Sequence, residues 1–316
     1  MTLHLDGPGV TVDAVVAVAR AQARVELTDT ALDRMKLARS VVERRADEAP
    51  TYGVSTGFGA LADTVIAPDR RAALQASLIR SHAAGMGPPI ESESVRAMML
   101  LRARTLALGH SGARPLVAEA IVALLNAGIT PVVPEHGSLG ASGDLAPLAH
   151  CALALLGEGE VDVEGSRLPA AEALARAGLE PIVLAEKEGL ALTNGTDGIL
   201  GMLALAVVDA ERLLDHADMA AAHTVEGVLA TDRAYAADLM ALRAHPGQAI
   251  SAANLRRWLA GSAIVASHRE DDSRVQDAYS IRCTPQVNGA ARDTIASLRS
   301  TVEIELGAAI DNPVVL

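Results

Sequence analysis

The chain has 316 residues, of which 50% are hydrophobic and 2% aromatic, with 39 acidic and 27 basic residues. This apolar content suffices for a large core and predicts a globular protein. The formal net charge of −12 would repel phosphate backbones and anionic membrane surfaces, which argues against nucleic-acid and membrane partners. Alanine and leucine supply much of the apolar content, and this usage predicts an all-α fold.

Two helices are predicted before residue 130. Apolar residues at helical spacing predict a first helix that Ser92 or Ser94 caps and that Gly109 ends. The second is expected to begin at Pro115, which the first turn of a helix tolerates, and to end before Gly128.

The rest of the chain continues this mainly helical pattern. In residues 131–138, Pro131 and Pro134 bracket two valines, so this segment is expected to be extended, and residues 145–156 read as a buried helix. Residues 160–169 alternate around a glycine, which predicts a minor β-hairpin before a helix that Pro169 opens. From Thr196 onward the pattern predicts long bundle helices.

Few features of the sequence bear on the cellular compartment of the protein. Cys151 and Cys283 have no C-x-x-C spacing, so they suggest neither a metal knuckle nor a disulfide framework. The N-terminus lacks the basic and apolar regions of a signal peptide. The most apolar run, residues 198–208, is too short for a bilayer, which needs about 20 residues. We therefore expect a cytoplasmic protein.

One loop carries an unusual string of small residues. Residues 137–150 read GSLGASGDLAPLAH, with Ala141, Ser142 and Gly143 followed by Asp144. The G-x-S-x-G pattern of a nucleophile elbow is not met, and no lysine follows in the spacing of a phosphate-binding loop. The plain alternative is a glycine-rich turn that leads into a helix capped by Asp144.

Backbone cyclisation explains these residue types better. The Gly143 nitrogen can attack the Ala141 carbonyl carbon, and loss of water then gives an imidazolone; dehydration of Ser142 adds an exocyclic methylene. Glycine has no Cβ to block the attack, alanine tolerates compression, and serine supplies the hydroxyl that leaves. The string therefore predicts an electrophile built from the backbone.

The motif ASGDLAPLAH resembles the prosthetic-group loop of the aromatic amino-acid ammonia-lyase and aminomutase family, which carries 4-methylidene-imidazole-5-one (MIO). The resemblance extends over nearly the whole chain, through TYGVSTGFG at 51–59, SHAAGMG at 81–87, LTNGTDG at 192–198, QDAYSIRCTPQV at 276–287 and DNPVV at 311–315. It implies a mainly helical MIO-bearing domain over residues 1–200 and the start of a central long-helix bundle over 201–316. The only cofactor implied is MIO, formed from Ala141, Ser142 and Gly143, and the histidines show no metal-ligand spacing.

The resemblance also implies roles for individual residues. Tyr52 would remove the β-proton while MIO takes up the amine, and Arg282 would bind the substrate carboxylate with its planar fork. Asn194 would orient the amino acid or the MIO carbonyl. Gln276 and Tyr279 precede Arg282 at three-residue spacing, so we expect one helix to carry all three into the site before Pro285 ends it. Taken singly, each is more typical of a capping or solvated residue.

Ser81 and His82 bear on the substrate, because a Ser-His pair resembles the histidine-selective branch of the family. The implied reaction is elimination of ammonia from L-histidine to give trans-urocanate. His82 can hydrogen-bond an imidazole ring, although a histidine satisfied within its own helix is the plainer reading. Because some tyrosine aminomutases of the family share this pair, a tyrosine or phenylalanine lyase or aminomutase remains the alternative.

Members of the family are longer than this chain, which stops at DNPVVL. They are homotetramers whose active sites draw residues from three subunits, so the implied partners are an amino-acid substrate and further copies of the chain. A third alternative is therefore a non-catalytic or incomplete fragment that keeps the fold of the MIO domain. On this reasoning we expect weak catalysis from the 316-residue chain alone.

Overall fold

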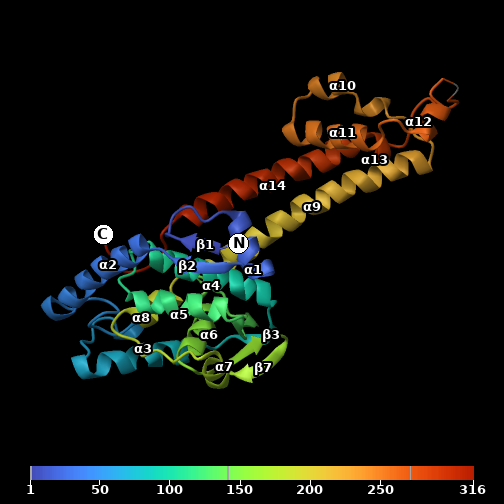
Figure 1. Cartoon of the computed structure of the whole chain (residues 1–316). Coiled ribbons are helices and arrows are strands. Elements are labelled where there is room, and N and C mark those ends of the chain that lie inside the picture. The colour runs from blue at the N-terminus through green and yellow to red at the C-terminus, as the bar shows by residue number, and fades with distance from the viewer. Residues whose placement is uncertain (1, 141, 271) are drawn as a thin grey trace. The chain divides into compact units, whose positions relative to one another are not determined.

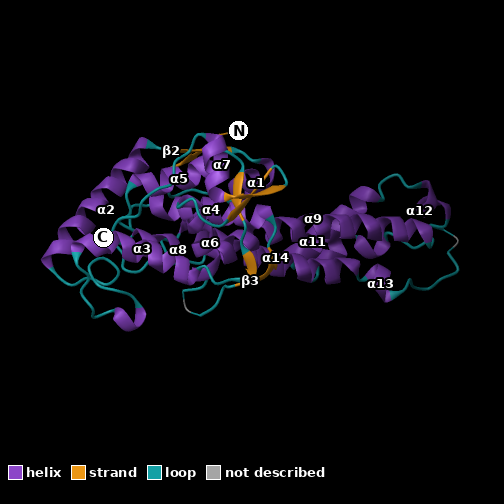
Figure 2. Cartoon of the chain, turned by 90° about the horizontal axis from the view of Figure 1, so that it is seen from below, coloured by secondary structure: helices purple, strands orange, loops and turns teal. Residues whose placement is uncertain are grey.

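The structure is a computed structural model that describes residues 2–140, 142–270 and 272–316. Helices account for most of the described chain, and the strands are short, as Figure 2 shows. This confirms the predicted all-α class. The chain forms two compact units, one that runs up to Leu205 and includes Val302–Leu316, and another that comprises Ala206–Thr301. The predicted domain division at residue 200 stays a prediction.

The first unit contains the N-terminal helices, labelled in Figure 1. They are α1 (Val12–Ala21), α2 (Asp29–Glu48), α3 (Pro68–His82), α4 (Ser92–Ala107), α5 (Pro115–Asn126), α6 (Leu145–Leu155), α7 (Ala170–Ala177) and α8 (Glu188–Thr193), with a 3₁₀ turn η1 (Gly59–Leu61). Helix α9 (Asp197–Gly227) begins in this unit and α14 (Thr284–Gly307) ends in it. The two helices predicted before residue 130 are thus confirmed as α4 and α5.

Helix α4 lies at the centre of the first unit. Residues 94–107 are all buried, and α4 packs against α1, α2 and α5. The predicted serine cap is wrong, because Ser92 is the first helical residue and Glu91 occupies the N-cap position without a side-chain cap bond. Ser94 is the third helical residue and is buried, so neither serine occupies the cap position.

Three short sheets complete the first unit. Strands β1 (Thr2–Leu5) and β2 (Arg24–Leu27) pair in parallel, and β3 (Met86–Pro89) pairs antiparallel with β5 (Pro134–His136). Strand β4 (Ile129–Pro131) adds to the hairpin of β6 (Glu160–Val163) and β7 (Ser166–Pro169). The predicted hairpin is confirmed, and α7 follows Pro169 directly.

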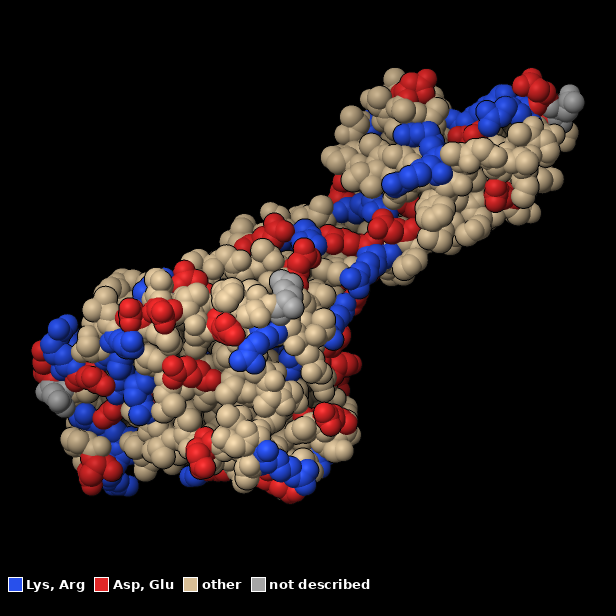
Figure 3. Space-filling view, viewed as in Figure 1, with Lys and Arg blue, Asp and Glu red and all other residues tan. Residues whose placement is uncertain are grey.

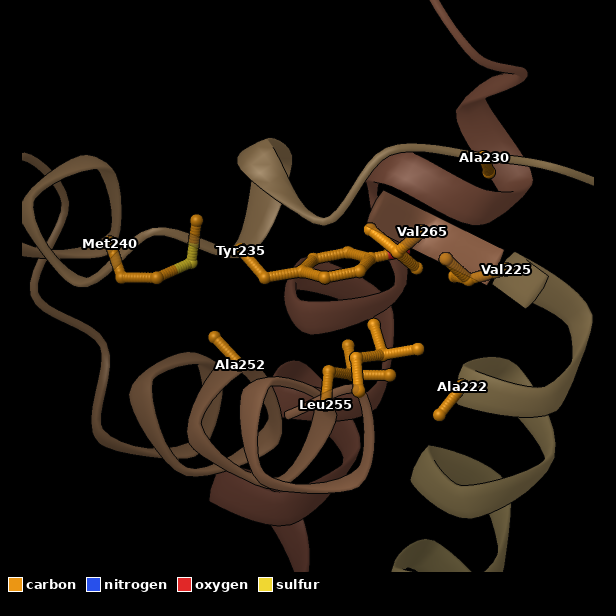
Figure 4. Close-up of a cluster of buried hydrophobic side chains, with 9 residues drawn as sticks. Ala222, Val225, Ala230, Tyr235, Met240, Ala252, Leu255 and Val265 are labelled. Atoms are coloured by element: carbon orange, nitrogen blue, oxygen red, sulfur yellow. The ribbon is translucent and has the colours of Figure 1, made fainter. Parts of the chain in front are cut away.

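The second unit packs short helices along the remainder of α9 and α14. These are η2 (Arg233–Tyr235), α10 (Ala237–Ala241), α11 (Pro246–Trp258), α12 (Ala263–Ser267) and α13 (Tyr279–Arg282). Figure 4 shows Tyr235 in the middle of its apolar cluster, between Met240 and Val265. The Tyr235 hydroxyl donates to the carbonyl of Ile281 at 2.9 Å, so this buried phenol also holds the segment of α13 in place.

Charged side chains of both signs are interspersed on the face shown in Figure 3.

A buried carboxylate in the second unit has several hydrogen-bond donors: Asp218 accepts hydrogen bonds from Ser251, Asn254, Asn288 and Arg292. Although burial opposes ionisation, these bonds hold the pKa of the Asp218 carboxyl below its usual value. Within the described ranges, no helix is long and apolar enough to cross a membrane.

Candidate active site

The small-residue string forms a closed turn. The N–H of Leu139 donates to the carbonyl of Gly143 at 3.0 Å. Gly140 and Gly143 have φ values of +67° and +69°, a left-handed conformation that glycine adopts without strain. Ser142 lies within this turn, whereas Ala141, the first residue of the predicted triad, lies outside the described residues.

The turn is backed by the loop that carries the LTNGTDG motif. Gly143 forms a parallel bridge with Gly195, and the N–H of Asp144 donates to the carbonyl of Gly195 at 2.9 Å. A Cβ on Gly143 would lie 2.9 Å from Cγ2 of Thr196 and 3.3 Å from the carbonyl oxygen of Gly195. Only glycine fits this cradle, and glycine is also the residue that cyclisation requires. The described residues therefore fit the formation of MIO.

The alternative of a simple glycine-rich turn predicts that the Asp144 side chain caps the following helix, and it does not do so. Asp144 occupies the N-cap position of α6, but its side chain makes no cap bond with that helix. Its carboxylate instead accepts the N–H of Ile199, in the first turn of α9, at 2.9 Å. Burial raises the pKa of the Asp144 carboxyl, and the bonds from the Ile199 and Gly198 backbone and from Ser138 only partly oppose this rise.

Asn194 lies between this turn and the DNPVV segment. Its Nδ2 donates to the carbonyl of Asn312 at 3.3 Å, which leaves its Oδ1 available as an acceptor. A buried ion pair holds the segment nearby, because Nζ of Lys187 lies 2.6 Å from Oδ2 of Asp311 and both side chains are almost fully buried. The structure therefore brings Asn194 and the turn together at the C-terminal end of α8.

His82 is the last residue of α3, a helix that packs against α6 and α8. Its Nδ1 lies 3.0 Å from the carbonyl of Leu78, which can only accept, and 3.0 Å from Oγ of Ser81, whose hydroxyl donates to the same carbonyl; we therefore assign the proton to Nδ1. In the neutral ring Nε2 is then an acceptor. His150 of α6 has the same tautomer, because its Nε2 accepts the N–H of Gly85 at 3.1 Å, and burial lowers its pKa.

Tyr52 lies in a tight loop. The carbonyl of Thr51 accepts the N–H groups of Val54 and Ser55, both at 3.0 Å. The Tyr52 ring contacts Phe58 edge-on, with ring centroids 6.2 Å apart. Gly53 has a φ of +69°, and a Cβ there would lie 2.7 Å from Leu190 of α8. The loop is therefore packed closely on α8, whose C-cap is Asn194.

The remaining predicted site residues belong to the second unit. The expected single helix through Gln276, Tyr279 and Arg282 is wrong, because α13 contains only Tyr279–Arg282 and Gln276 precedes it. Pro285 does not end that helix but lies in the first turn of α14, where its missing N–H costs nothing. Gln276 and Arg282 line one hollow of about 420 Å³, and Tyr279 is 71% exposed.

The described residues offer no candidate metal site and no disulfide bond. Among the described residues, no three His, Cys, Asp or Glu side chains form a cluster able to hold a metal ion. Cys151 and Cys283 are free thiols, and burial raises the pKa of the Cys151 thiol.

Sequence reasoning missed Arg102, a buried side chain of α4 that donates to the carbonyls of Ala191 and Asn194. The sequence does indicate buried cations that need partners, because Arg96, Arg102 and Arg104 interrupt an otherwise apolar helix. Long cations in a buried helix must find acceptors.

The mainly helical fold and the turn at 139–144 agree with the class of protein that the sequence resembles. The chain belongs to the aromatic amino acid lyase family, whose sequence model matches residues 10–316. This confirms the predicted family.

Similarity to individual proteins supports the same family. Histidine ammonia-lyase of Streptomyces coelicolor is 56% identical over 317 aligned positions, which cover 100% of this chain and 62% of that protein. The solved structure of tyrosine aminomutase from Streptomyces globisporus matches with a TM-score of 0.92 and 37% identity, over 100% of this chain and 63% of that one. Histidine ammonia-lyase from Trypanosoma cruzi gives a TM-score of 0.88 and 38% identity, over 100% and 58%. The chain thus spans 62% of the length of the first relative.

Proposed function

We propose that the chain is part of an ammonia-lyase that converts L-histidine to trans-urocanate and ammonia. The observation that carries the proposal is the glycine cradle, in which Gly143 fits against Gly195 and Thr196 with no room for a Cβ. The relative named histidine ammonia-lyase, at 56% identity over the whole chain, supports histidine as the substrate.

The cofactor in this proposal is MIO, formed from Ala141, Ser142 and Gly143. Once formed, it supplies an electrophile for the substrate amine, which is otherwise a poor leaving group. The chain's own contribution is the turn, in which the Leu139 to Gly143 hydrogen bond and the bridge to Gly195 hold the backbone closed. No metal takes part in the proposed reaction.

Side chains of the chain would bind the substrate and move its proton. Tyr52 takes the β-proton at its phenolic oxygen, in a loop that Gly53 packs against α8. Nε2 of His82 accepts the N–H of the substrate imidazole, because Nδ1 is occupied by the carbonyl of Leu78. Oδ1 of Asn194 accepts from the substrate, since Nδ2 donates to Asn312.

Three residues of the second unit would also take part in substrate binding. Arg282 offers a planar guanidinium that can hold the carboxylate with two parallel hydrogen bonds. Gln276 lines the same hollow and adds an amide to it, and Tyr279, whose side chain is exposed, is the first residue of the helix that carries Arg282.

The proposal also covers the domain division, the oligomeric state and the compartment of the protein. We place the MIO-bearing domain at residues 1–200 and the start of the bundle at 201–316, with the active protein a homotetramer in the cytoplasm. Exposed apolar side chains of the second unit support contacts between copies: Trp258 is 53% exposed, Ile250 50% and Leu242 85%. Two free cysteines support a reducing compartment.

A second candidate, an aminomutase acting on tyrosine, is favoured by the TM-score of 0.92 to tyrosine aminomutase. An aminomutase returns the amine to the neighbouring carbon, so it yields a β-amino acid with little free ammonia. Product analysis of histidine and tyrosine incubations separates the two functions. Urocanate with ammonia supports the lyase, and a β-amino acid as the main product overturns it.

Intact mass tests the cofactor independently of turnover. The purified chain should weigh two water molecules less than its translated sequence. Ser142→Ala removes the hydroxyl that leaves and should abolish the formation of urocanate, while far-UV circular dichroism stays unchanged. A wild-type mass equal to the translated sequence would contradict cyclisation.

A further inference from the structure

Arg102 lies at the meeting point of two helix ends. It is only 2% exposed, and its Nη1 donates to the carbonyls of Ala191 at 2.9 Å and Asn194 at 3.2 Å, which close the C-terminus of α8. Its Nη2 pairs with Oδ2 of Asp197, the first residue of α9. One guanidinium therefore joins the end of α8 to the beginning of α9, with charge that suits the carbonyl end of a helix.

The connection between these helix ends is the wall behind the small-residue turn. It contains Gly195, which bridges to Gly143 and accepts the N–H of Asp144. A Cβ on Gly195 would overlap Nη2 of Arg102, so the guanidinium occupies the space that a side chain would take. The position of the Gly195 backbone is thus set from one side by Arg102 and from the other by the turn.

We propose that Arg102 is a positioning residue for MIO formation: it fixes the backbone of Asn194 and Gly195 and, through that wall, keeps the turn at 139–144 compressed. Arg102 does not itself touch the reacting atoms. The inference rests on the proposed function, since it assigns Arg102 to the formation of that cofactor.

A general contribution to stability is the competing explanation, and the chain offers a matched control. Arg96 lies on the same helix and is 4% exposed. Its guanidinium donates to the carbonyls of Val18 and Leu125 at 3.0 to 3.2 Å, away from the turn. Loss of either arginine leaves buried carbonyls unbonded, but only loss of Arg102 also removes the partner of the Asp197 carboxylate and frees the wall behind the turn.

The test compares Arg102→Lys and Arg102→Met with Arg96→Lys and Arg96→Met in the full chain. The first readout is amide hydrogen exchange at Asp144 and Leu139, whose N–H groups close the turn. We expect exchange to be faster by about tenfold or more in the Arg102 variants, the effect of losing one charge-assisted hydrogen bond, and unchanged in the Arg96 variants. This readout does not require MIO, so it is independent of the proposed function.

The second readout is the fraction of folded chains that have lost two water molecules. We expect chain that retains both water molecules to accumulate in the Arg102 variants, while the folded Arg96 variants show the complete two-water mass deficit. If the Arg102 variants do not fold, Gly195→Ala keeps the charge yet displaces the guanidinium, and it should show both effects. Wild-type exchange and complete dehydration in a folded Arg102→Met or Gly195→Ala chain would overturn the inference. A wild-type chain without the mass deficit would instead refute the proposed cofactor.

Discussion

The carboxylate of Asp144 accepts the backbone N–H of Ile199 at 2.9 Å, so the residue after the small-residue turn is bound to the first turn of α9. Helix N-termini favour negative charge, yet the carboxyl is 1% exposed, and burial raises its pKa above the ordinary 3.8. Desolvation is therefore the larger of the two opposing effects.

This balance predicts a pH dependence for Asp144→Asn. Because the folded-state pKa is raised, the contribution of Asp144 to stability is fully present below pH 3.8 and is lost as the pH rises through the raised value. The asparagine can still accept from Ile199 and does not ionise. We expect the free energy of unfolding of wild type, relative to the variant, to fall as the pH rises in urea titrations. A difference that grows with pH would show that the N–H donors outweigh burial.

His150 predicts the opposite slope. Burial lowers its pKa below the ordinary 6.5, and its neutral Nε2 accepts the N–H of Gly85. Its contribution to stability is therefore present above pH 6.5 and is lost as the pH falls through the lowered value. In His150→Gln, unfolding free energies should fall less steeply over that acidic window.

Gly143→Ala should damage both stability and cyclisation. Its φ of +69° is unfavourable for alanine, and the new Cβ would lie 2.9 Å from Cγ2 of Thr196. We expect a loss of about 1–3 kcal/mol in the free energy of unfolding and no two-water mass deficit. Gly165→Ala is the control, because it is also left-handed, at +78°, but has nothing within 4 Å of its Cβ. A dehydrated Gly143→Ala chain would refute the cradle argument.

His82→Leu should lower kcat/KM for histidine by about tenfold, the effect of one lost hydrogen bond from the imidazole N–H to Nε2. Preference should shift toward phenylalanine, because leucine offers an apolar contact instead of an acceptor. Rates of urocanate and cinnamate formation measure this ratio. Ser81→Ala tests whether the neighbour matters, since its Oγ lies 3.0 Å from Nδ1 of His82. An unchanged substrate ratio in His82→Leu would remove His82 from substrate recognition.

Tyr235→Phe should act on Arg282 through α13. The variant keeps the apolar packing but leaves the carbonyl of Ile281 without the hydroxyl that donates to it at 2.9 Å. We expect a loss of about 1 kcal/mol in stability and a higher KM for histidine, with the two-water deficit unchanged. Met240→Leu, a volume-conserving change in the same cluster, should leave KM as it is. Equal KM values in both variants would separate Tyr235 from substrate binding.

Local patterns were enough to predict several elements of the fold. Pro115 and Gly128 bracket α5, and the alternation around Gly165 marks the β6–β7 hairpin, because each signal acts within a few residues of the chain. The string Ala141, Ser142 and Gly143 likewise carries its chemistry in its own spacing.

Tertiary structure decided how that string is held. Gly143 meets Gly195, Asp144 binds Ile199 and not its own helix, and the guanidinium of Arg102 fills the space beside Gly195. These contacts join residues some 50 or more positions apart, so no local periodicity encodes them. The sequence does not distinguish the three arginines of α4, but in the folded chain each donates to different backbone carbonyls. A buried guanidinium must find hydrogen-bond acceptors, and tertiary packing decides which acceptors lie within reach.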